Sequence, residues 1–281
     1  LSNGRVAHVS LKGKVAAEQF VEGNQYQVSP ATADLRSSPA GPRERQLLRG
    51  DAFLVLDVQD GWAFGRAEAN GYVGWLDAAE LSADLPGPTH TVSVARTYGK
   101  AKPELKSTEP HTPLPFGARL HVCDAVGDWS RVVWSRGAGA CDLFVPTQHL
   151  DPIGQVQTDP VAVAALFLGT PYLWGGNSAF GIDCSGLVQA AMLACGVACP
   201  GDSDQQRARL GDEIAMTAER RPGDLYFWPG HVGILSDSDT LLHANAGFMS
   251  TVHEPLDMAI DRIEAAEGKS VSLRRRVTLP S

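Results

Sequence analysis

Short segments of alternating apolar and polar residues fill most of the first half of the chain, separated by turns that contain glycine or proline. One such segment spans residues 52–58 and a later one spans residues 71–76. A period of two is typical of strands that bury one face. Many short strands with frequent turns indicate small barrels or sandwiches. We therefore expect an all-β first half.

The alternating segments form two copies of one unit, at residues 33–81 and 89–150. In each copy an apolar segment is followed by a tryptophan in a turn, Trp62 in the first and Trp129 in the second. The same order in two copies is a stronger indication of a repeat than either copy alone. The pattern resembles bacterial SH3-like domains. It predicts one such domain at residues 31–85 and another at 89–151, while residues 1–30 stay unassigned.

From residue 155 onward the spacing of apolar residues is helical in some segments and strand-like in others. Asp159 precedes Pro160, which is the order of a helix N-cap and a first-turn proline. Helices come first and alternating strands later, which indicates an α+β domain at residues 155–281. We expect helices at 161–168, 184–195 and 257–266, a polar loop at 200–206, and strands at 224–228, 231–235, 241–246 and 271–277.

Charge and hydropathy narrow the classes of partner. The net charge is −8, so a basic surface for nucleic acid or for an anionic bilayer is not expected. No apolar run approaches the length that crosses a membrane, and we expect no membrane insertion. Arg274, Arg275 and Arg276 form the only basic cluster, and the apolar residues around them predict the exposed side of a last strand.

The five cysteines are an odd and scattered set, which does not indicate a disulfide framework. Cys195 and Cys199 flank the end of a predicted helix, and we expect both to be small buried residues. The first residues lack the basic-then-apolar pattern of a signal peptide, which favours a reducing cytoplasm. The chain also lacks an initiator methionine, so a removed leader, and with it a periplasmic or secreted location, stays open.

Cys184 lies in the segment GIDCSG at 181–186, where an extended stretch is expected to turn into a helix. Asp183 can cap that helix, which leaves Cys184 at its first position. Unpaired backbone N–H groups and the positive end of the helix dipole then face the sulfur and favour the thiolate. Two interpretations follow from the local pattern, a reactive thiol or one more buried cysteine.

Two histidines could supply the base that a cysteine nucleophile needs and the group that orients the base. If the predicted hairpin is centred on Ser238, His231 and His243 are diagonal neighbours on one face of the sheet. Asn245 would lie opposite His231 and is a substitute orienting group. Gly233 would leave room for the histidine pair. A zinc site built from the cysteine and both histidines lacks close ligand spacing and a fourth ligand, so we expect no metal.

Five motifs of the last unit occur in an order that resembles NlpC-type cell-wall cysteine peptidases, which are papain-like. The resemblance implies Cys184 as nucleophile, His231 as base, His243 as the third residue and Tyr172 beside the oxyanion site. It implies no cofactor. For Trp174 we expect packing beneath the helix of Cys184. The motifs are GTPYLWGG at 169–176, GIDCSG at 181–186, RPGDL at 221–225, GHVGI at 230–234 and LHA at 242–244.

Two SH3-like domains ahead of such a peptidase resemble a subgroup that cleaves the γ-D-glutamyl bond to a diamino acid in peptidoglycan stem peptides. That subgroup favours a free amino-terminal L-alanine, whose ammonium group needs several acceptors. Gly201 stands where the subgroup usually has an arginine. By position, the residues implied to bind the substrate are Glu44, Tyr72, Asp183, Ser185 and Ser203.

The expected fold is therefore α+β, a papain-like cysteine peptidase domain preceded by two small all-β SH3-like barrels. The expected substrate is the stem peptide L-Ala-γ-D-Glu-diamino acid, either diaminopimelate or lysine, in murein peptide recycling or wall turnover. Two alternatives stay open. One is a non-catalytic module that binds cell-wall peptides, and the other is an amidase or transpeptidase on the same scaffold.

Overall fold

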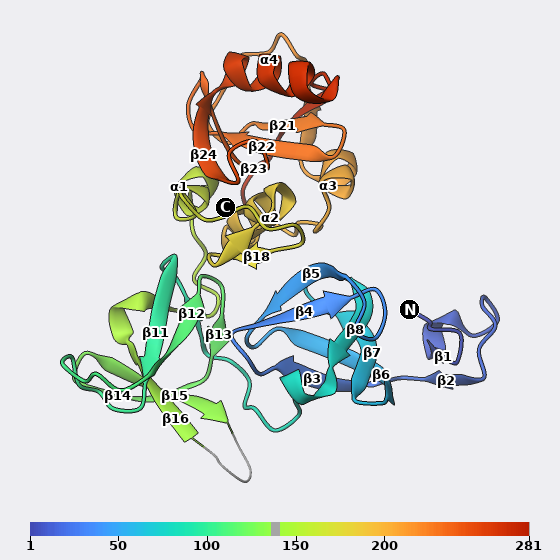
Figure 1. The fold of residues 1–281 in the computed structure, drawn as a ribbon, viewed down its shortest axis with the longest axis vertical. Coiled ribbons are helices and arrows are strands. Elements are labelled where there is room, and N and C mark those ends of the chain that lie inside the picture. Colours follow the sequence, from blue (N-terminus) through green and yellow to red (C-terminus); the bar gives the residue numbers. More distant parts are fainter. Residues whose placement is uncertain (136–140, 281) are drawn as a thin grey trace. The chain divides into compact units, whose positions relative to one another are not determined.

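The structure, a computed structural model, describes residues 1–135 and 141–280. The chain divides into two compact units, Leu1–Gly154 and Gln155–Ser281 (Figure 1). Within the described ranges the first unit is built of strands and short 3-10 turns, whereas the second combines strands with α-helices. No helix in these ranges is long and apolar enough to span a membrane.

A seven-stranded sheet occupies the first part of unit one, and its core includes Leu35, Phe53 and Leu76. Each of its neighbouring pairs is antiparallel. Residues left unassigned by the sequence supply one of its strands, β3. Along the sheet the strands are β5 (Arg43–Leu48), β4 (Thr32–Arg36), β8 (Val73–Asp77), β7 (Trp62–Ala67), β6 (Ala52–Gln59), β3 (Asn24–Val28) and β9 (Leu81–Ser82).

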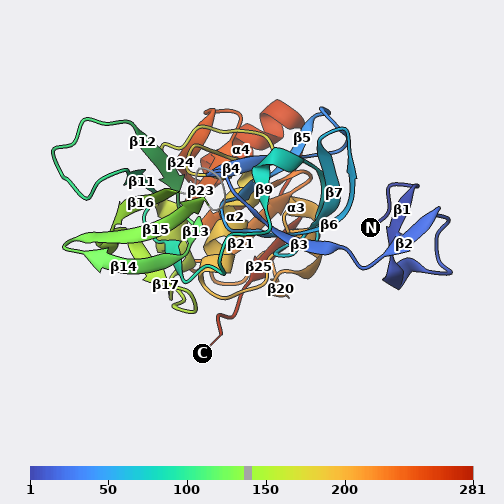
Figure 2. The same cartoon turned by 90° about the horizontal axis from the view of Figure 1, so that it is seen from below.

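The amino-terminal residues form a parallel pair, β1 (Val6–His8) and β2 (Gln19–Val21), which extends from the seven-stranded sheet (Figure 2). Asn3 and Arg5 tie this pair to the sheet by hydrogen bonds to the Asp57 carboxylate. Val6 is buried against the outer face of the sheet, together with Leu54, Leu56, Phe64 and Trp75.

The second part of unit one repeats the first. Trp62 begins β7 and pairs with Asp77 on β8, and Trp129 begins β15 and pairs with Pro146 on β16. In both copies a 3-10 turn and a short last strand follow, which confirms the predicted repeat. The second copy has a five-stranded sheet of β12 (His111–Pro115), β11 (Arg96–Lys100), β16 (Cys141–Pro146), β15 (Trp129–Ser135) and β14 (Val122–Val126), and a three-stranded sheet of β13 (Arg119–Leu120), β10 (His90–Val92) and β17 (Leu150–Pro152).

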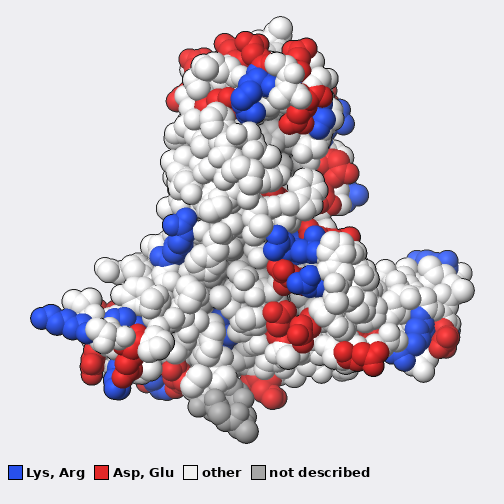
Figure 3. Space-filling model, in the orientation of Figure 1, with Lys and Arg blue, Asp and Glu red and all other residues white. Residues whose placement is uncertain are grey.

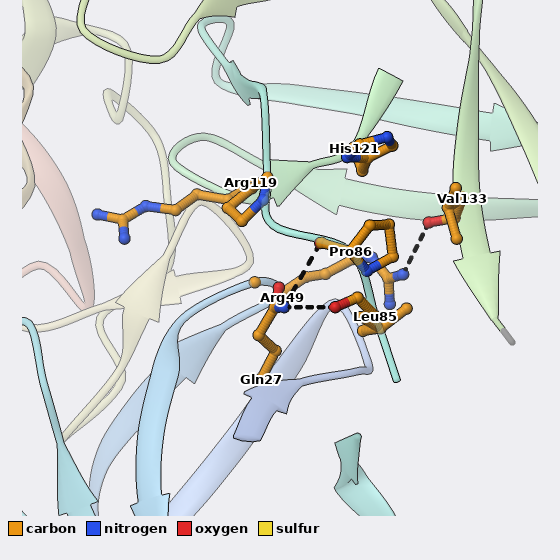
Figure 4. Close-up of a pocket in the computed structure, with 9 residues that line it drawn as sticks. Gln27, Arg49, Leu85, Pro86, Arg119, His121 and Val133 are labelled. Carbon is orange, nitrogen blue, oxygen red and sulfur yellow. Dashed lines mark hydrogen bonds between the residues drawn. The ribbon is translucent and has the colours of Figure 1, made fainter. Parts of the chain in front are cut away.

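Arg49 joins the two copies (Figure 4). Its guanidinium donates to the backbone oxygens of Val133 at 3.1 Å and Trp134 at 2.6 Å, and it also donates to the Ser29 oxygen. It lies 3.7 Å from the centroid of the Trp134 ring, a cation–π contact. Burial lowers the pKa of Arg49 to about 10, so the side chain stays charged at neutral pH. Nearby, Gln27 donates to the linker oxygens of Leu85 and Pro86.

The second unit is a six-stranded antiparallel sheet between helices. Figure 1 shows α4 on one side of the sheet and α2 on the other. Short strands β18 (Asn177–Ser178) and β19 (Gly181–Ile182) precede α2. The sheet order is β20 (Asp212–Ile214), β25 (Leu273–Arg276), β21 (Leu225–Trp228), β22 (His231–Leu235), β23 (Thr240–Asn245) and β24 (Ser250–Pro255), and the helices are α1 (Pro160–Ala165), α2 (Cys184–Ala194), α3 (Ser203–Arg209) and α4 (Leu256–Glu267).

Helix α4 is amphipathic, and its apolar side covers one face of the sheet. Leu256, Ala259 and Ile263 are buried with Leu235 and Leu241 of the sheet. On the opposite side of α4, acidic residues face solvent, as Figure 3 shows at the top of the second unit. Because side chains alternate along a strand, His231 and His243 lie on the same sheet face as Leu235 and Leu241.

The polar segment 200–206 was expected to be a loop, and this is wrong for most of it. Residues Ser203–Arg209 form α3. The helix has a single fully buried side chain, Gln206, which donates to the backbone oxygens of Ser185 and Pro200. Such a helix is anchored by hydrogen bonds instead of an apolar stripe, so its sequence lacks the usual signal.

The expectation of three exposed arginines on the last strand is wrong: Arg275 and Arg276 are half-buried, and the largest departure is Arg274. Its side chain is fully buried and pairs with the buried carboxylate of Asp224 at 2.9 Å. It also donates to the backbone oxygens of Ala215, Met216 and Ala218. Strand β25 lies between β20 and β21 in the sheet, so one of its faces must be buried, and paired charge makes this burial tolerable. The buried states of Cys195 and Cys199 are confirmed.

Candidate active site

Helix α2 begins at Cys184, and Asp183 caps it as predicted. One carboxylate oxygen of Asp183 accepts from the Gly186 N–H at 2.6 Å and from the Ser185 hydroxyl at 2.9 Å. The other oxygen accepts from the Gly175 N–H at 3.0 Å. Cys184 is 5% exposed and stands in the first turn, where unpaired N–H groups and the helix dipole favour a thiolate.

Glycines let three backbone segments close around this turn. A Cβ on Gly176 would lie 2.5 Å from the Gly181 oxygen, and one on Gly186 would lie 2.7 Å from the Gly176 oxygen. Gly175 has a φ of 70°, which favours glycine. The Asp183 N–H donates to the Gly176 oxygen at 3.1 Å. The glycines of the two motifs therefore serve the close contact that fixes the start of α2.

Tyr172 runs beside this turn in extended conformation. Its N–H donates to the Met249 oxygen at 3.0 Å, and it bridges to Ile182, two residues before Cys184. Burial raises the pKa of Tyr172, and the nearby charges of Cys184 and Asp183 raise it further. The phenol therefore keeps its proton and is available as a donor.

Trp174 was expected to pack beneath the helix, and this is wrong. Its side chain is 71% exposed. Leu173 lies against Gly181, where a Cβ would meet the leucine side chain at 2.7 Å. Because neighbouring side chains in an extended segment point to opposite sides, the inward position belongs to Leu173 and Trp174 points outward.

The histidine pair has the predicted register. Ile234 pairs with Leu242 and Leu235 with Leu241, so the hairpin is centred on Ser238. His231 Nε2 lies 2.9 Å from His243 Nδ1, and the ring centroids are 5.2 Å apart. Helix α2, which begins at Cys184, packs against β22 and β23, which carry the two histidines.

Gly233 serves a neighbour other than the one expected. A Cβ on Gly233 would lie 2.7 Å from the side chain of Leu241, so the glycine makes room for this core leucine and not for the histidine pair. Asn245 does not replace His243; its amide nitrogen lies 3.1 Å from His243 Nε2.

Beyond the histidines, the site contains an ion pair that the sequence did not predict. Glu254 on β24 lies with one carboxylate oxygen 3.0 Å from His243 Nε2. Arg262 on α4 donates to both oxygens of Glu254, at 2.8 Å each. Strand alternation places Glu254 diagonal to His243, as His243 is to His231. That diagonal could have been found only if residues 250–255 had been recognised as a strand.

Protein families and known proteins match both units of the chain. A model described as the NlpC/P60 family matches residues 169–258, and one described as a bacterial dipeptidyl-peptidase SH3 domain matches residues 35–81. A protein of Bacillus subtilis named gamma-D-glutamyl-L-lysine dipeptidyl-peptidase is 30% identical over 227 residues, which cover 72% of this chain and 72% of the relative. The chain belongs to the NlpC/P60 family.

Two further comparisons extend along most of this NlpC/P60 protein. A Bacillus cereus protein, also named gamma-D-glutamyl-L-lysine dipeptidyl-peptidase, is 28% identical and matches 77% of this chain and 68% of its own length. A crystal structure of an NlpC/P60 family protein from Bacillus cereus has a TM-score of 0.76 at 19% identity, covering 92% of this chain and all of that chain. The predicted family, fold class and class of enzyme, a cysteine peptidase, are confirmed.

Burial and the neighbouring charges keep both His231 and His243 neutral in this NlpC/P60 protein. Burial lowers the pKa of His231 to about 3, with the repulsion that a protonated His243 would exert and the positive charge of Arg262 as smaller causes. Burial also lowers the pKa of His243 and outweighs the opposing effect of Glu254. Burial alone would raise the pKa of Glu254, but the hydrogen bonds from Arg262 and His243 lower it to about 2. A neutral His231 can accept a proton.

Zinc does not suit these residues. Both ring nitrogens of His243 already have partners, His231 and Glu254, so His243 has no lone pair to offer a metal without losing a contact. A neutral His231 paired with His243 suits the acceptance of a proton.

The remaining residues implied in substrate binding divide between the two units. Asp183 and Ser185 are bonded to each other beside Cys184, and both are buried. Ser203 is half-buried at the start of α3. In the first unit, Glu44 is exposed on β5, and Tyr72 packs against the core of the seven-stranded sheet. The roles of these residues stay predictions.

Proposed function

We propose that this protein hydrolyses the γ-D-glutamyl bond to a diamino acid in peptidoglycan stem peptides that carry a free amino-terminal L-alanine. The observation that carries the proposal is the His231–His243 pair, 2.9 Å between ring nitrogens, on strands packed against the helix that begins at Cys184. Two relatives named gamma-D-glutamyl-L-lysine dipeptidyl-peptidase, similar over most of the chain, support the choice of bond.

The reaction is acyl transfer to water through a thioester. His231 Nδ1 takes the proton of the Cys184 thiol, and the thiolate attacks the γ-carbonyl carbon of D-glutamate. The backbone N–H of Cys184 and the phenol of Tyr172 donate to the oxyanion. When the carbon–nitrogen bond breaks, His231 returns its proton to the departing amine of the diamino acid. His231 then takes a proton from water, whose oxygen attacks the thioester. When the carbon–sulfur bond breaks, L-Ala-γ-D-Glu leaves and the proton passes from His231 to the sulfur, which restores the thiol.

Recognition of the free ammonium requires several acceptors, because the group has three N–H donors. We assign this role within the second unit to the carboxylate of Asp183 and to the hydroxyls of Ser185 and Ser203. Asp183 already accepts three hydrogen bonds that fix the start of α2.

The test compares L-Ala-γ-D-Glu-diamino acid peptides with their N-acetylated forms. The protein should release L-Ala-γ-D-Glu from the free peptide, and Cys184→Ala should release none, as followed by mass spectrometry. Lysine and diaminopimelate versions establish the leaving group. Failure to cleave any free peptide, or activity that survives in Cys184→Ala, would contradict the proposal. Equal cleavage of the acetylated peptide would contradict only the role of the amine.

We also propose that the reaction takes place in the cytoplasm, where free stem peptides are recycled. The exposed free thiols of Cys123 and Cys141 support this setting, because an oxidising compartment favours disulfides. Cell fractionation is the test. Recovery of the protein outside the cytoplasm would place the same chemistry in wall turnover instead.

A further inference from the structure

We propose that Glu254, held by Arg262, is a positioning residue that decides which ring nitrogen of His243 carries a proton and, through it, which nitrogen of His231 acts as the base. The inference rests on the proposed function of the Cys184 site and deepens it. The site then has four members in series behind the thiol, on three adjacent strands and one helix: His231 on β22, His243 on β23, Glu254 on β24 and Arg262 on α4.

The contacts of the series are short and buried. His231 to His243 is 2.9 Å, His243 to Glu254 is 3.0 Å, and Glu254 to Arg262 is 2.8 Å at both oxygens. The His243 side chain is fully buried and that of Glu254 is 6% exposed. Polar groups in such surroundings are costly unless each has its partner, so the contacts specify one arrangement.

The charge of Glu254 decides which ring nitrogens of His243 and His231 carry a proton. Glu254 is bonded bidentately to a guanidinium and stays ionised, so it only accepts hydrogen bonds. The proton of neutral His243 must therefore be on Nε2, which leaves a lone pair on Nδ1. That lone pair accepts from His231 Nε2–H, and the lone pair of His231 is then on Nδ1. A neutral imidazole has one ring N–H and one nitrogen with a lone pair, so the position of the proton on His243 fixes its position on His231.

Asn245 does not reverse this order. Its amide nitrogen lies 3.1 Å from His243 Nε2, but its oxygen accepts from the Phe248 N–H at 2.9 Å, which fixes the orientation of the amide. An amide N–H cannot accept, so the charged carboxylate of Glu254 is the partner of the Nε2 proton.

The turn after β23 is shaped to hold Arg262. A Cβ on Gly247 would lie 2.8 Å from a guanidinium nitrogen of Arg262, so the glycine leaves room for the guanidinium in this position. The ring of Phe248 lies 5.2 Å from the Arg262 guanidinium carbon and covers it. Arg262, held between Gly247 and Phe248, thus fixes the position of Glu254 beside His243. A mobile ion pair on the surface would not fix the carboxylate in this way.

The charged groups around the histidines come from several elements. Glu254 faces them from β24, Arg262 from α4 and Lys269 from the segment after α4, while the Cys184 thiol begins α2. In this setting Glu254 is the carboxylate that contacts His243, and through His243 it supports the imidazolium that forms when His231 accepts the thiol proton. Removing its charge should make the thiolate–imidazolium pair harder to form.

The test uses Glu254→Gln and Arg262→Lys in the full chain and measures alkylation of Cys184 by iodoacetamide across pH. Glu254→Gln should slow alkylation at neutral pH about 10-fold or more and move the rise in rate to higher pH. Arg262→Lys keeps the charge but not the bidentate geometry, so its rate should lie between those of Glu254→Gln and the parent. With the dipeptidyl substrate, kcat should fall while KM changes little, because Glu254 does not touch the substrate.

The matched control is Asp224→Asn, which breaks another buried carboxylate–arginine contact of the same sheet. It should lower the melting temperature and leave the alkylation profile unchanged. Nitrogen NMR of the imidazole rings should show His243 protonated at Nε2 in the parent protein and lose this preference in Glu254→Gln.

Unchanged alkylation and tautomers in folded Glu254→Gln, with only a lower melting temperature, would reduce Glu254 to a structural role and overturn the inference. Alkylation needs no peptide, so the two proposals fail separately. If the parent protein cleaves no stem peptide but the alkylation profile still shifts in Glu254→Gln, the proposed function alone is overturned. Cleavage by the parent with an unshifted profile in the variant overturns the positioning role alone.

Discussion

Tyr172 is held through its backbone by Met249 on one side and Ile182 on the other, so its hydroxyl is not needed to keep it in place. We therefore expect Tyr172→Phe to fold normally and to lower kcat roughly 100-fold, the cost of one oxyanion donor. Steady-state kinetics on the stem peptide measures this. Tyr226→Phe, which removes a buried hydroxyl elsewhere in the unit, should leave kcat unchanged. Equal effects of both variants would contradict a role at the oxyanion.

Gly176 allows the backbone of 173–176 to touch that of Gly181. An alanine there would place Cβ 2.5 Å from a backbone oxygen, which cannot move aside as a flexible side chain can. We expect Gly176→Ala to lower the free energy of unfolding by about 1–3 kcal/mol, as other overpacking changes do, and to reduce activity with it. Gly87→Ala is the control, because nothing lies within 4 Å of a Cβ at that position. Urea unfolding compares the two.

Single residues differ in how far the sequence could place them. Cys184 was identified by its cap, and His231 and His243 by counting from Ser238, because local spacing decides both. Trp174 was misplaced, since only the packing of Leu173 against Gly181 decides which of two neighbours points inward. Glu254 and Arg262 were missed because their meeting depends on contacts between a strand and a helix that neither local pattern encodes.

Among the elements, the short β units were predictable because alternation, turns and a repeated tryptophan agree with one another. Strand β24 was not, since its sequence STVHEP offers little apolar alternation and ends in proline. Helix α3 is anchored by Gln206 and lacks an apolar face. The arginines of β25 suggested solvent, whereas the buried carboxylate of Asp224, distant in sequence, accepts from Arg274.

Arg49 links the two copies of the repeat within the first unit. Arg49→Met would leave the buried backbone oxygen of Val133 without its Arg49 donor, at about 1–3 kcal/mol for the unsatisfied group, and would also remove the donor to the part-buried Trp134 oxygen. Calorimetry should show a lower unfolding temperature for the first unit. Arg66→Met removes only a half-exposed pair with Glu68 and should change little. Identical traces for both variants would contradict the link.

The molecule as a whole should respond unevenly to acid. The folded-state pKa values of His231 (about 3) and His243 lie below the ordinary 6.5, and that of Glu254 (about 2) lies below 4.5. Below the ordinary pKa, the unfolded chain therefore binds more protons than the folded unit. Stability from these groups is full above about pH 6.5 and is lost as pH falls toward about 3.

In the first unit, the pKa shifts of buried groups have opposite effects on stability. Burial raises the pKa of Asp51 and Glu80, which adds stability on acidification, and lowers the pKa of His90, which removes some. We expect the second unit to lose protease resistance at a lower urea concentration at about pH 5 than at about pH 7, with a smaller change in the first unit. Mass spectrometry of the surviving fragments identifies the units. An equal decline in both would contradict the assignment.

The turn that joins β23 to β24 has two attachments. On one side Gly247 lies against Arg262, and on the other the Met249 oxygen accepts from Tyr172. Surface turns are where chains usually tolerate inserted residues. Here an insertion would shift the support of the base and of the oxyanion donor together, so this loop has a fixed length. A tag or sensor peptide belongs instead in the exposed turn around Ser238, where the Ser238 hydroxyl and the Asp239 N–H donate to carboxylates of the same turn.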